Sequence, residues 1–434
     1  MKKQTTISLL FIIFILSLIF NLIKSLINGY EKESWLITEF LINYQGGFVR
    51  RGLLGEALYQ FSQYSTISPY YIIIALCLAS YVYLIYWYSS SLINNGFPFF
   101  ILPFVFFLGS PIINNYWVRK DAIVLLFFIL ILHCLRKESF IYIILTNLLF
   151  VTGILIHESI GFFGFPVIAL IIYTRYSHSN FLNKQFTFRR LCTTIVLLLP
   201  SLIAFASVIY FKGSRTIAGN IWDSWENIKF PIQAATHGAP PAAIDGISWS
   251  LQKGLRYFYS NLMNMNYDIY APFAWFFILL SVYFIIININ RLDFKILTYK
   301  PTQAINRENL STILVIQLVA VIPLFILASD YGRWVTMWTC STFAILLTIP
   351  EKTLSTLPPL FVRSFSHHLN NRLDEYVGNS KSFIVLMSFV IGVPYYNWSM
   401  EKYIETPASV HIIQFISTIF RQIVIMFKLV IGLN

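Results

Sequence analysis

Asn43-Tyr-Gln-Gly-Gly-Phe-Val-Arg-Arg-Gly-Leu-Leu-Gly-Glu56 is a short polar stretch between two strongly apolar runs. It holds four glycines, the adjacent arginines Arg50 and Arg51, and the carboxylate of Glu56. Glycine allows backbone to approach backbone or ligand closely. An arginine at the centre of a bilayer costs about 2.5–3.5 kcal/mol, so arginines beside apolar runs are usually anchored or functional. We interpret the stretch as a bent, basic, extracytoplasmic element that binds an anion. The alternative is an interfacial helix whose arginines extend to lipid headgroups.

The composition around this stretch is that of a membrane protein. The 434 residues are 57% hydrophobic and 12% charged, and the mean hydropathy is +0.67. Apolar runs of about 18 residues recur along the chain, which predicts an all-α, polytopic integral membrane protein. The net charge of +12 is scattered between the runs, so it does not indicate nucleic-acid binding.

No sequence motif indicates a cofactor. The four cysteines occur singly, without a CxxC or Cys/His spacing, so we expect neither a metal site nor a disulfide framework. A P-loop, a GxGxxG that follows a strand, and a DxD motif are also missing from the sequence. We therefore expect a protein that needs no metal, nucleotide or other cofactor.

The apolar runs predict eleven or twelve spans within a single domain, 1–434. The first run follows Met1-Lys-Lys, continues to about Ile27, and is too long for a signal peptide, so we expect an uncleaved span. The further spans are expected near 70–89, 97–110, 121–135, 140–157, 160–175, 191–211, 270–290, 310–328, 333–349 and 382–398. The last run, 409–432, contains Arg421 and Lys428, and it either spans the bilayer or lies in its interface.

Basic residues orient these spans. Lys2 and Lys3 predict a cytoplasmic N-terminus by the positive-inside rule. Counting from there, the loops expected on the inside carry Arg136 and Lys137; Arg175, Lys184, Arg189 and Arg190; Arg291, Lys295, Lys300 and Arg307; and Lys352, Arg363, Arg372 and Lys381. Two larger segments, 28–69 and 212–269, are then extracytoplasmic.

Four polar clusters fall on the same outer side in this topology. They are Arg50–Arg51 with Glu39 and Glu56 nearby; Asn114-Asn-Tyr-Trp-Val-Arg-Lys-Asp121, which contains Arg119 and Lys120; His157-Glu158; and Asp330-Tyr-Gly-Arg333-Trp334. Clusters from separate helices that meet at one membrane face make a plausible active-site cleft. None has the spacing of metal ligands, so we expect no metal.

Several of these residues also have a structural interpretation. Asp330 and Asp121 could each cap the helix that follows, and Asp330 could pair with Arg333 three residues later. His157 and Glu158 would point about 100° apart on a helix and could not both face one ligand. We expect Glu158 to face the cleft.

The clusters together predict diphosphate binding and acid–base chemistry. Guanidinium groups hold phosphate oxygens bidentately and stabilise charge on a phosphate leaving group. The expected diphosphate-binding residues are Arg50, Arg51, Arg119, Lys120 and Arg333. A carboxylate can accept the proton of an attacking hydroxyl. The expected catalytic residues are Glu158, Asp330 and His157.

The long outer segment 212–269 is rich in aromatic residues. Trp222, Trp225 and Trp249 are candidates for stacking on sugar rings. Aromatic residues at this density equally suit a membrane-interface belt.

At these residues the sequence resembles bacterial O-antigen and capsular polysaccharide repeat-unit polymerases of the Wzy type. The resemblance lies in about a dozen spans with one long outer loop, and in Gly47-Phe-Val-Arg-Arg-Gly-Leu-Leu-Gly55 and Asp330-Tyr-Gly-Arg-Trp334. It implies a glycosyltransferase of the bacterial inner membrane with a periplasmic active site. The implied substrate is an undecaprenyl-diphosphate-linked oligosaccharide, and membrane lipid, a chain-length regulator and a flippase are implied partners.

Two other functions remain open. One is a different polytopic glycosyltransferase that uses lipid-phosphate sugars, since such enzymes usually place an acidic residue in the first outer loop, where Glu31, Glu33 and Glu39 lie. The other is a flippase or transporter of lipid-linked sugars. A transporter should carry ionisable residues near the middle of the bilayer and often has repeated halves, and the sequence shows neither.

Overall fold

The fold is entirely helical in the residues that the computed structural model describes. These are residues 16, 18–94, 110–175, 188–226, 228, 230, 239–250, 252–256, 260, 271–288 and 306–377. Every regular element within these ranges is an α-helix or a short 3-10 helix, which confirms the all-α class.

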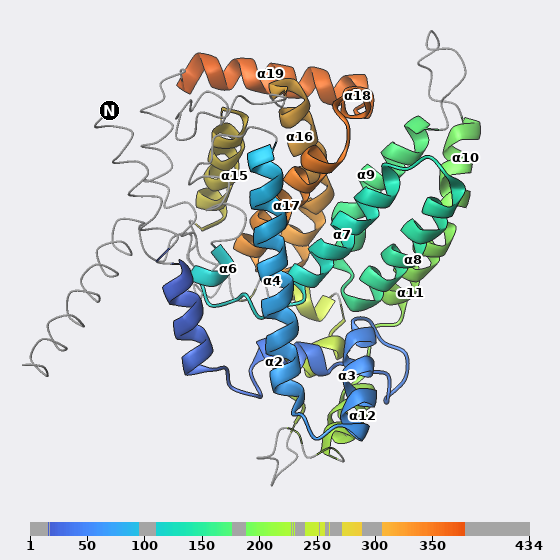
Figure 1. The fold of residues 1–434 in the computed structure, drawn as a ribbon, viewed down its shortest axis with the longest axis vertical. Coiled ribbons are helices and arrows are strands. Elements are labelled where there is room, and N and C mark those ends of the chain that lie inside the picture. The colour runs from blue at the N-terminus through green and yellow to red at the C-terminus, as the bar shows by residue number, and fades with distance from the viewer. Residues whose placement is uncertain are drawn as a thin grey trace, which may run out of the picture.

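The helices form a bundle with a smaller lobe at one end (Figure 1). The bundle contains α4 (Pro69–Asn94), α6 (Ser110–Ile113), α7 (Asp121–Leu135), α8 (Phe140–Ile156), α9 (Ser159–Arg175), α10 (Phe188–Leu197), α11 (Leu199–Tyr210), α15 (Ala271–Ile287), α16 (Arg307–Leu327), α17 (Tyr331–Thr348), α18 (Glu351–Leu354) and α19 (Leu360–Val377). The lobe contains α2 (Trp35–Thr38), η1 (Glu39–Leu41), α3 (Gly52–Tyr64), α12 (Arg215–Glu226), α13 (Ala242–Asp245) and η3 (Gly246–Ser248).

Two described helices are long and apolar enough to cross a bilayer, Pro69–Ser91 and Arg307–Leu327. A third span results if α10 and α11, which meet at 68°, count as one. Pro200 lies at the second position of α11, and proline removes a backbone donor, which explains the bend. The shorter apolar helices are Leu18–Asn28, Asp121–Leu135, Phe140–Ile156, Ser159–Arg175 and Trp275–Ile287.

The expected spans can be compared with these helices one by one. Each expected span within the described residues coincides with a helix or with the bent pair. The shorter helices, at 1.5 Å per residue, cover less than the roughly 30 Å of a bilayer core. The expected spans 382–398 and 409–432 lie outside the described residues, as does 97–110 except for its last residue. Lys2, Lys3 and the first expected span before residue 16 also lie outside them.

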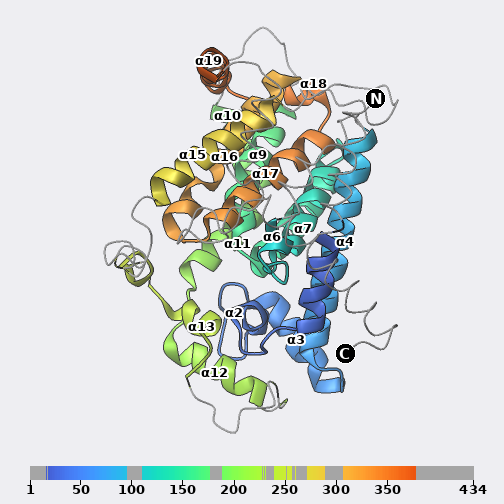
Figure 2. The same cartoon turned by 90° about the vertical axis from the view of Figure 1, so that its left-hand side faces the viewer.

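The helix ends fall into two groups at opposite ends of the bundle (Figures 1 and 2). The α7–α8 turn, the end of α9 and the start of α16 lie at the end that α19 crosses. At that end Arg175 donates to the Leu135 carbonyl, and Arg307 pairs with Asp374 at 2.7 Å. The loops expected outside lie at the other end, beside the lobe. An alternating topology requires this grouping, and its orientation across a bilayer stays a prediction.

Helix α19 packs on the bundle through polar side chains. Ser366 Oγ donates to Ser311 Oγ of α16 at 2.7 Å, and Asn370 Nδ2 donates to the same oxygen at 3.0 Å. Phe361 and Phe365 point away from this contact and are exposed. The outward face of α19 is thus partly apolar, unlike that of an ordinary surface helix.

The lobe joins the two segments that are expected to be extracytoplasmic. Trp225 Nε1 donates to the Leu41 carbonyl at 2.8 Å. Asn43 Nδ2 donates to Ser224 Oγ at 2.9 Å. Residues from 28–69 and from 212–269 therefore share one buried interface, although about 180 positions separate them in the chain.

Glycines of the opening stretch allow this packing. A Cβ at Gly55 of α3 would overlap the carbonyl oxygen of Ile42. A Cβ at Gly46 would lie 2.6 Å from the Ile217 carbonyl oxygen of α12. The close backbone approach expected from these glycines is confirmed, and its partner is the chain itself.

We predict that Gly55→Ala lowers the stability of the protein strongly. The added methyl group meets backbone on a neighbouring segment, which cannot rotate away as a side chain can. Overpacking of this kind costs about 1–3 kcal/mol, occasionally more. The apparent melting temperature of the purified protein measures it.

Gly219→Ala in α12 is the matched control. Nothing lies within 4 Å of a Cβ at Gly219, and alanine favours a helix by about 1 kcal/mol over glycine. This variant should melt at or above the wild-type temperature. Equal destabilisation by both substitutions would contradict the proposed close contact at Gly55.

A second prediction concerns the orientation of the two ends. Cysteine introduced at Tyr64 or Thr216, in a background without the native cysteines, should react with an impermeant thiol reagent in intact cells. Both positions are exposed on the lobe. Cysteine at Glu138, exposed in the α7–α8 turn, should react only after the membrane is opened. Labelling of one lobe position without the other would contradict the topology.

Candidate functional site

Five separate segments meet where the lobe joins the bundle. They are Glu39 in η1, Arg51 before α3, residues 119–121 at the start of α7, residues 157–158 between α8 and α9, and residues 330–333 at the start of α17. Their side chains form one connected network of ion pairs and hydrogen bonds. The sequence therefore places its ionisable residues at helix ends that the fold brings together.

Arg51 is the link between the lobe and the bundle. It precedes the first residue of α3 with φ 66° and ψ 9°, in the left-handed region. That conformation costs a non-glycine residue of order 1 kcal/mol or more, so its surroundings must hold it. Its Nε donates to Glu158 Oε2 at 2.8 Å and to Oε1 at 3.0 Å, and Nη2 also donates to Oε1. Its Nη1 lies 3.6 Å from Glu39 Oε1.

Lys120 fixes the backbone of Arg51. The Lys120 side chain is fully buried, and its Nζ donates to the Arg51 carbonyl oxygen at 2.9 Å. The ammonium also lies 5.7 Å from the centre of the Phe40 ring, close enough for a cation–π attraction. Burial lowers the pKa of Lys120 to about 8, against the attraction of the Glu39 and Glu158 carboxylates. The lysine expected to bind diphosphate thus has a structural contact.

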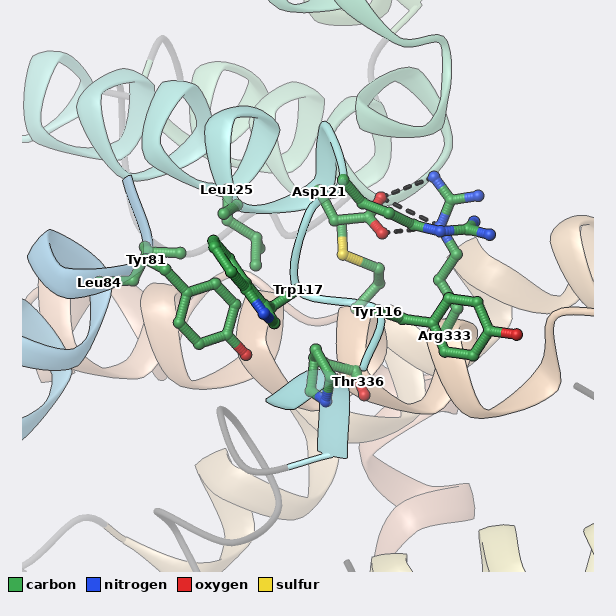
Figure 3. Close-up of a pocket in the computed structure, with 12 residues that line it drawn as sticks. Tyr81, Leu84, Tyr116, Trp117, Asp121, Leu125, Arg333 and Thr336 are labelled. Atoms are coloured by element: carbon green, nitrogen blue, oxygen red, sulfur yellow. Dashed lines mark hydrogen bonds and ion pairs between the residues drawn. The ribbon is translucent and has the colours of Figure 1, made fainter. Parts of the chain in front are cut away.

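Arg333 makes the second bidentate pair. Its Nε donates to Asp121 Oδ2 at 2.8 Å and its Nη2 donates to Oδ1 at 2.7 Å, as Figure 3 shows. Its Nη1 donates to Asp330 Oδ2 at 3.3 Å, which confirms the expected pairing three residues apart. Arg119 Nη1 donates to the same Asp330 oxygen at 3.2 Å. These contacts join α7 to α17.

Asp330 and Asp121 were both expected to cap a helix, and the structure places them differently. Asp330 does occupy the position before α17, but its side chain makes no capping hydrogen bond. Its carboxylate pairs with Arg119 and Arg333 instead. Asp121 is the first residue of α7, and Lys120 occupies the capping position. The expectation that Asp121 caps this helix is therefore wrong, because its carboxylate is held by Arg333 from another helix.

His157 and Glu158 both face the network, contrary to the expectation that only one could. Helix α8 ends at Ile156, and His157 is extended, with φ −162° and ψ 124°. Because these residues do not continue the helix, the 100° separation does not apply. Glu158 reaches Arg51, and His157 Nε2 lies 3.3 Å from Glu39 Oε1.

The His157 ring is buried and neutral. Burial lowers its pKa, and the positive charge of Arg51 lowers it further. The Ser159 N–H lies 3.1 Å from Nδ1, and Arg333 Nη2 lies 3.0 Å from Nε2. A neutral imidazole has one acceptor nitrogen, so only one of these contacts is a hydrogen bond. The Glu39 carboxylate beside Nε2 favours the proton there, which leaves Nδ1 to accept from Ser159.

Glu39 is the most buried carboxylate of the network, with 1% of its side chain exposed. Its Oε1 lies 3.3 Å from His157 Nε2 and 3.6 Å from Arg51 Nη1. Burial alone would raise its pKa, but His157 and the charges of Arg333 and Arg119 hold the pKa well below its usual range. Glu39 is thus an ionised group that is stabilised by its contact with His157 and by the surrounding positive charges.

Glu39 and Asp121 belong to the predicted polar clusters but not to the expected catalytic and diphosphate-binding residues, although the sequence carries a signal for each. Glu39 is the one charged residue in the apolar run 35–42, where an isolated carboxylate needs a partner. Asp121 directly follows two cations. Neither signal identifies the residue that pairs with the carboxylate, because in both cases that residue lies in a distant segment.

Other predicted residues lie apart from the network. Arg50 Nη2 donates to the Gly246 carbonyl in the lobe at 3.3 Å. Glu56 accepts from the Tyr44 backbone N–H at 2.9 Å. Both side chains fasten the opening stretch to its own surroundings.

The three tryptophans proposed for glycan stacking differ in exposure. Trp222 and Trp225 are buried in the core of the lobe, and stacking on a sugar requires an exposed ring face. Trp249 is partly exposed, with Lys253 Nζ 4.4 Å from the centre of its ring and Nε1 bound to Asp245. The glycan-binding prediction therefore rests on Trp249.

Three carboxylates of the network are partly exposed. Asp330 is 28% exposed, and Glu158 and Asp121 are each 13% exposed. Arg51 and His157 hold the pKa of Glu158 well below its usual range, despite burial, so it is ionised. A carboxylate in this form can accept a proton once its arginine partner is otherwise engaged.

A small cavity lies beneath the Arg333–Asp121 pair (Figure 3). It is lined by residues of α4, α7 and α17 and of the stretch that precedes α7, among them Tyr81, Tyr116 and Trp117. Its volume of about 20 Å³ is enough for about one water molecule. A cavity of this size does not admit a diphosphate group.

Neither metal-ligand groups nor comparisons with known proteins assign a function to the site. Among the described residues, no group of three or more His, Cys, Asp or Glu side chains is placed to hold a metal ion. Comparisons of the chain with family models, with curated proteins and with solved structures find no match. The site is interpreted from its own geometry.

We predict that Lys120 gives the protein a pH-dependent stability. Its folded pKa of about 8 lies below the usual lysine pKa of 10.5. Between these values the unfolded chain binds more protons than the native one, so stability rises with pH from about 8 to 10. The penalty for burying the ammonium is fully present below pH 8, and it amounts to about 3 kcal/mol.

Lys120→Met removes the titrating group and should lose this rise. The measurement is the difference in apparent melting temperature between wild type and variant across pH 7 to 10. Lys212→Met, at an exposed lysine of the lobe, keeps Lys120 and should retain the wild-type dependence. An unchanged pH dependence in Lys120→Met would contradict the assignment.

Proposed function

We propose that this protein is a membrane glycosyltransferase that polymerises undecaprenyl-diphosphate-linked oligosaccharide repeat units into O-antigen or capsular polysaccharide. The observation that carries the proposal is the meeting of five segments in one network of four cations and four carboxylates at one end of the bundle. Ionisable residues with perturbed pKa values cluster at functional sites, and ionisable residues in or beside membrane helices commonly mark paths for charged ligands.

The chemistry of the proposed reaction suits these groups. The acceptor hydroxyl oxygen forms a bond to the anomeric carbon of the growing glycan, and the bond from that carbon to the diphosphate oxygen breaks. A carboxylate takes the hydroxyl proton, and Glu158 is the first candidate because it is ionised and partly exposed. The electron pair leaves with the diphosphate, whose charge arginine can stabilise. Arg51 is the most exposed cation of the network's described ion pairs.

The proposed location is the bacterial inner membrane, with a cytoplasmic N-terminus and the network on the periplasmic side. Apolar helices of the bundle and the grouping of its ends support this location. On that side, the lipid carrier can stay in the bilayer while its diphosphate reaches the helix ends. A flippase would deliver the substrate, and a chain-length regulator is a proposed partner.

A second candidate is a glycosyltransferase that uses lipid-phosphate sugars without polymerising repeat units. Glu39 favours it, because this buried carboxylate of the first outer segment lies at the centre of the network. A flippase or transporter fits less well. The ionisable network lies at helix ends, whereas a transporter site lies near the middle of the bilayer.

We expect Glu158→Gln to abolish polymer formation while the protein remains in the membrane. The amide keeps the size of the side chain but cannot accept the proton, a loss of about 10²-fold or more in rate. Asp330→Asn is the second variant in order of expected effect. The assay follows the product ladder that purified protein forms from lipid-linked repeat units, beside a binding measurement.

Asp223→Asn is the control, since Asp223 is exposed on α12 of the same lobe and takes no part in the described network. It should polymerise at the wild-type rate. Polymer formation by both Glu158→Gln and Asp330→Asn at that rate would exclude these carboxylates as the base. Transfer of a single sugar without a ladder would favour the second candidate function.

A further inference from the structure

Two carboxylates flank Arg51, and their surroundings differ. Glu158 holds Nε and Nη2 of the guanidinium in a bidentate pair, and it is partly exposed. Glu39 faces Nη1 at 3.6 Å from the other side, too far for a hydrogen bond, and it is almost fully buried. Arg51 itself is 21% exposed. One of its partners can therefore move toward solvent, and the other cannot.

Glu39 is fixed by the packing of its backbone. It begins η1, whose three residues are all buried. Helix α3 presses on this segment at Gly55, where no room remains for a Cβ beside the backbone of residues 40 and 42. Lys120 holds the Arg51 carbonyl from α7. The backbones of both Glu39 and Arg51 are thus held, and the Arg51 side chain keeps one negative neighbour in any state.

We infer that Glu158 is an exchangeable partner of Arg51: a phosphate group of the substrate replaces the Glu158 carboxylate on the guanidinium, while Glu39 remains as the permanent counter-ion. The inference rests on the proposed function and specifies how its site takes up the diphosphate. The two parallel N–H groups that now hold carboxylate oxygens fit two phosphate oxygens equally well. The exchange makes and breaks no covalent bond.

The exchange has a consequence for the reaction. A carboxylate held bidentately by arginine has its lone pairs occupied and is a weak base. Displaced by the diphosphate, Glu158 is free to accept a proton beside the bond that breaks. Substrate binding would then activate the base, and the free protein would keep it inactive. If Glu158 moves away, Glu39 still compensates the charge of Arg51. The guanidinium is therefore not left as an unpaired buried charge.

The test is the affinity of the purified full chain for inorganic pyrophosphate and for undecaprenyl diphosphate, at constant salt. Glu158→Gln removes the internal competitor, so it should bind both probes about tenfold more tightly than wild type, a difference of about 1.4 kcal/mol. Arg51→Ala should bind them weakly. The double variant Arg51→Ala/Glu158→Gln should lose the gain, since the competition exists only on Arg51.

Asp223→Asn is the charge-matched control. It removes a carboxylate that is exposed on α12 of the lobe and takes no part in the described network. Its affinity for both probes should stay at the wild-type value. Glu158→Asp gives a second measure, because it keeps the charge while drawing the carboxylate back from Arg51. It should bind with an affinity between wild type and Glu158→Gln.

Three results would each overturn the inference. In the first, Glu158→Gln binds no more tightly than wild type. In the second, the gain in affinity persists without Arg51. In the third, Asp223→Asn shows an equal gain. The polymer assay decides the proposed function separately. If the wild-type protein forms polymer but Glu158→Gln shows no gain in affinity, the exchange is rejected and the proposed function stands. If Glu158→Gln gains affinity but the wild-type protein forms no polymer, the polymerase is rejected and the exchange stands.

Discussion

The bidentate pair between Arg51 and Glu158 is the contact on which the arrangement of the site depends. It ties the lobe to the bundle, because Arg51 precedes α3 and Glu158 lies between α8 and α9. Lys120 ties the same residue to α7. Removing one partner of a buried ion pair costs about 3–5 kcal/mol, although the pair itself adds little to stability. The network therefore acts mainly by specifying which helix ends meet.

Charge compensation also explains why this arrangement tolerates burial. Every cation of the network has a carboxylate or a carbonyl within reach, from Arg333 on Asp121 to Lys120 on the Arg51 backbone. Glu39 is compensated by His157, whose Nε2 lies 3.3 Å from Oε1, and by the surrounding positive charges. A group stabilised in this way is sensitive to the position of its neighbours. The compact lobe, with its glycine contacts, keeps those neighbours in place.

The residues of the network differ in their exposure to solvent. Glu39 and His157 lie at its buried side, whereas Glu158, Asp330 and Arg51 reach its open side. In the proposed function, the buried residues hold the geometry of the network and the partly exposed residues contact the ligand. The same residues thus serve both the fold and a site, as is common where binding groups lie on rigid elements.

The sequence by itself determined the helical class, the position of the described apolar helices, and which residues carry ionisable chemistry, because apolar periodicity and isolated charges are local properties. It also indicated the close backbone approach at the opening stretch, since glycine is the residue that permits it. Tertiary structure alone decided the pairing. Arg333 meets Asp121 rather than only its neighbour Asp330, and His157 joins Glu158 in the network because α8 ends one residue before it. It also buried Trp222 and Trp225. Pairing and burial depend on which distant segments meet, and no local pattern in the chain contains that information.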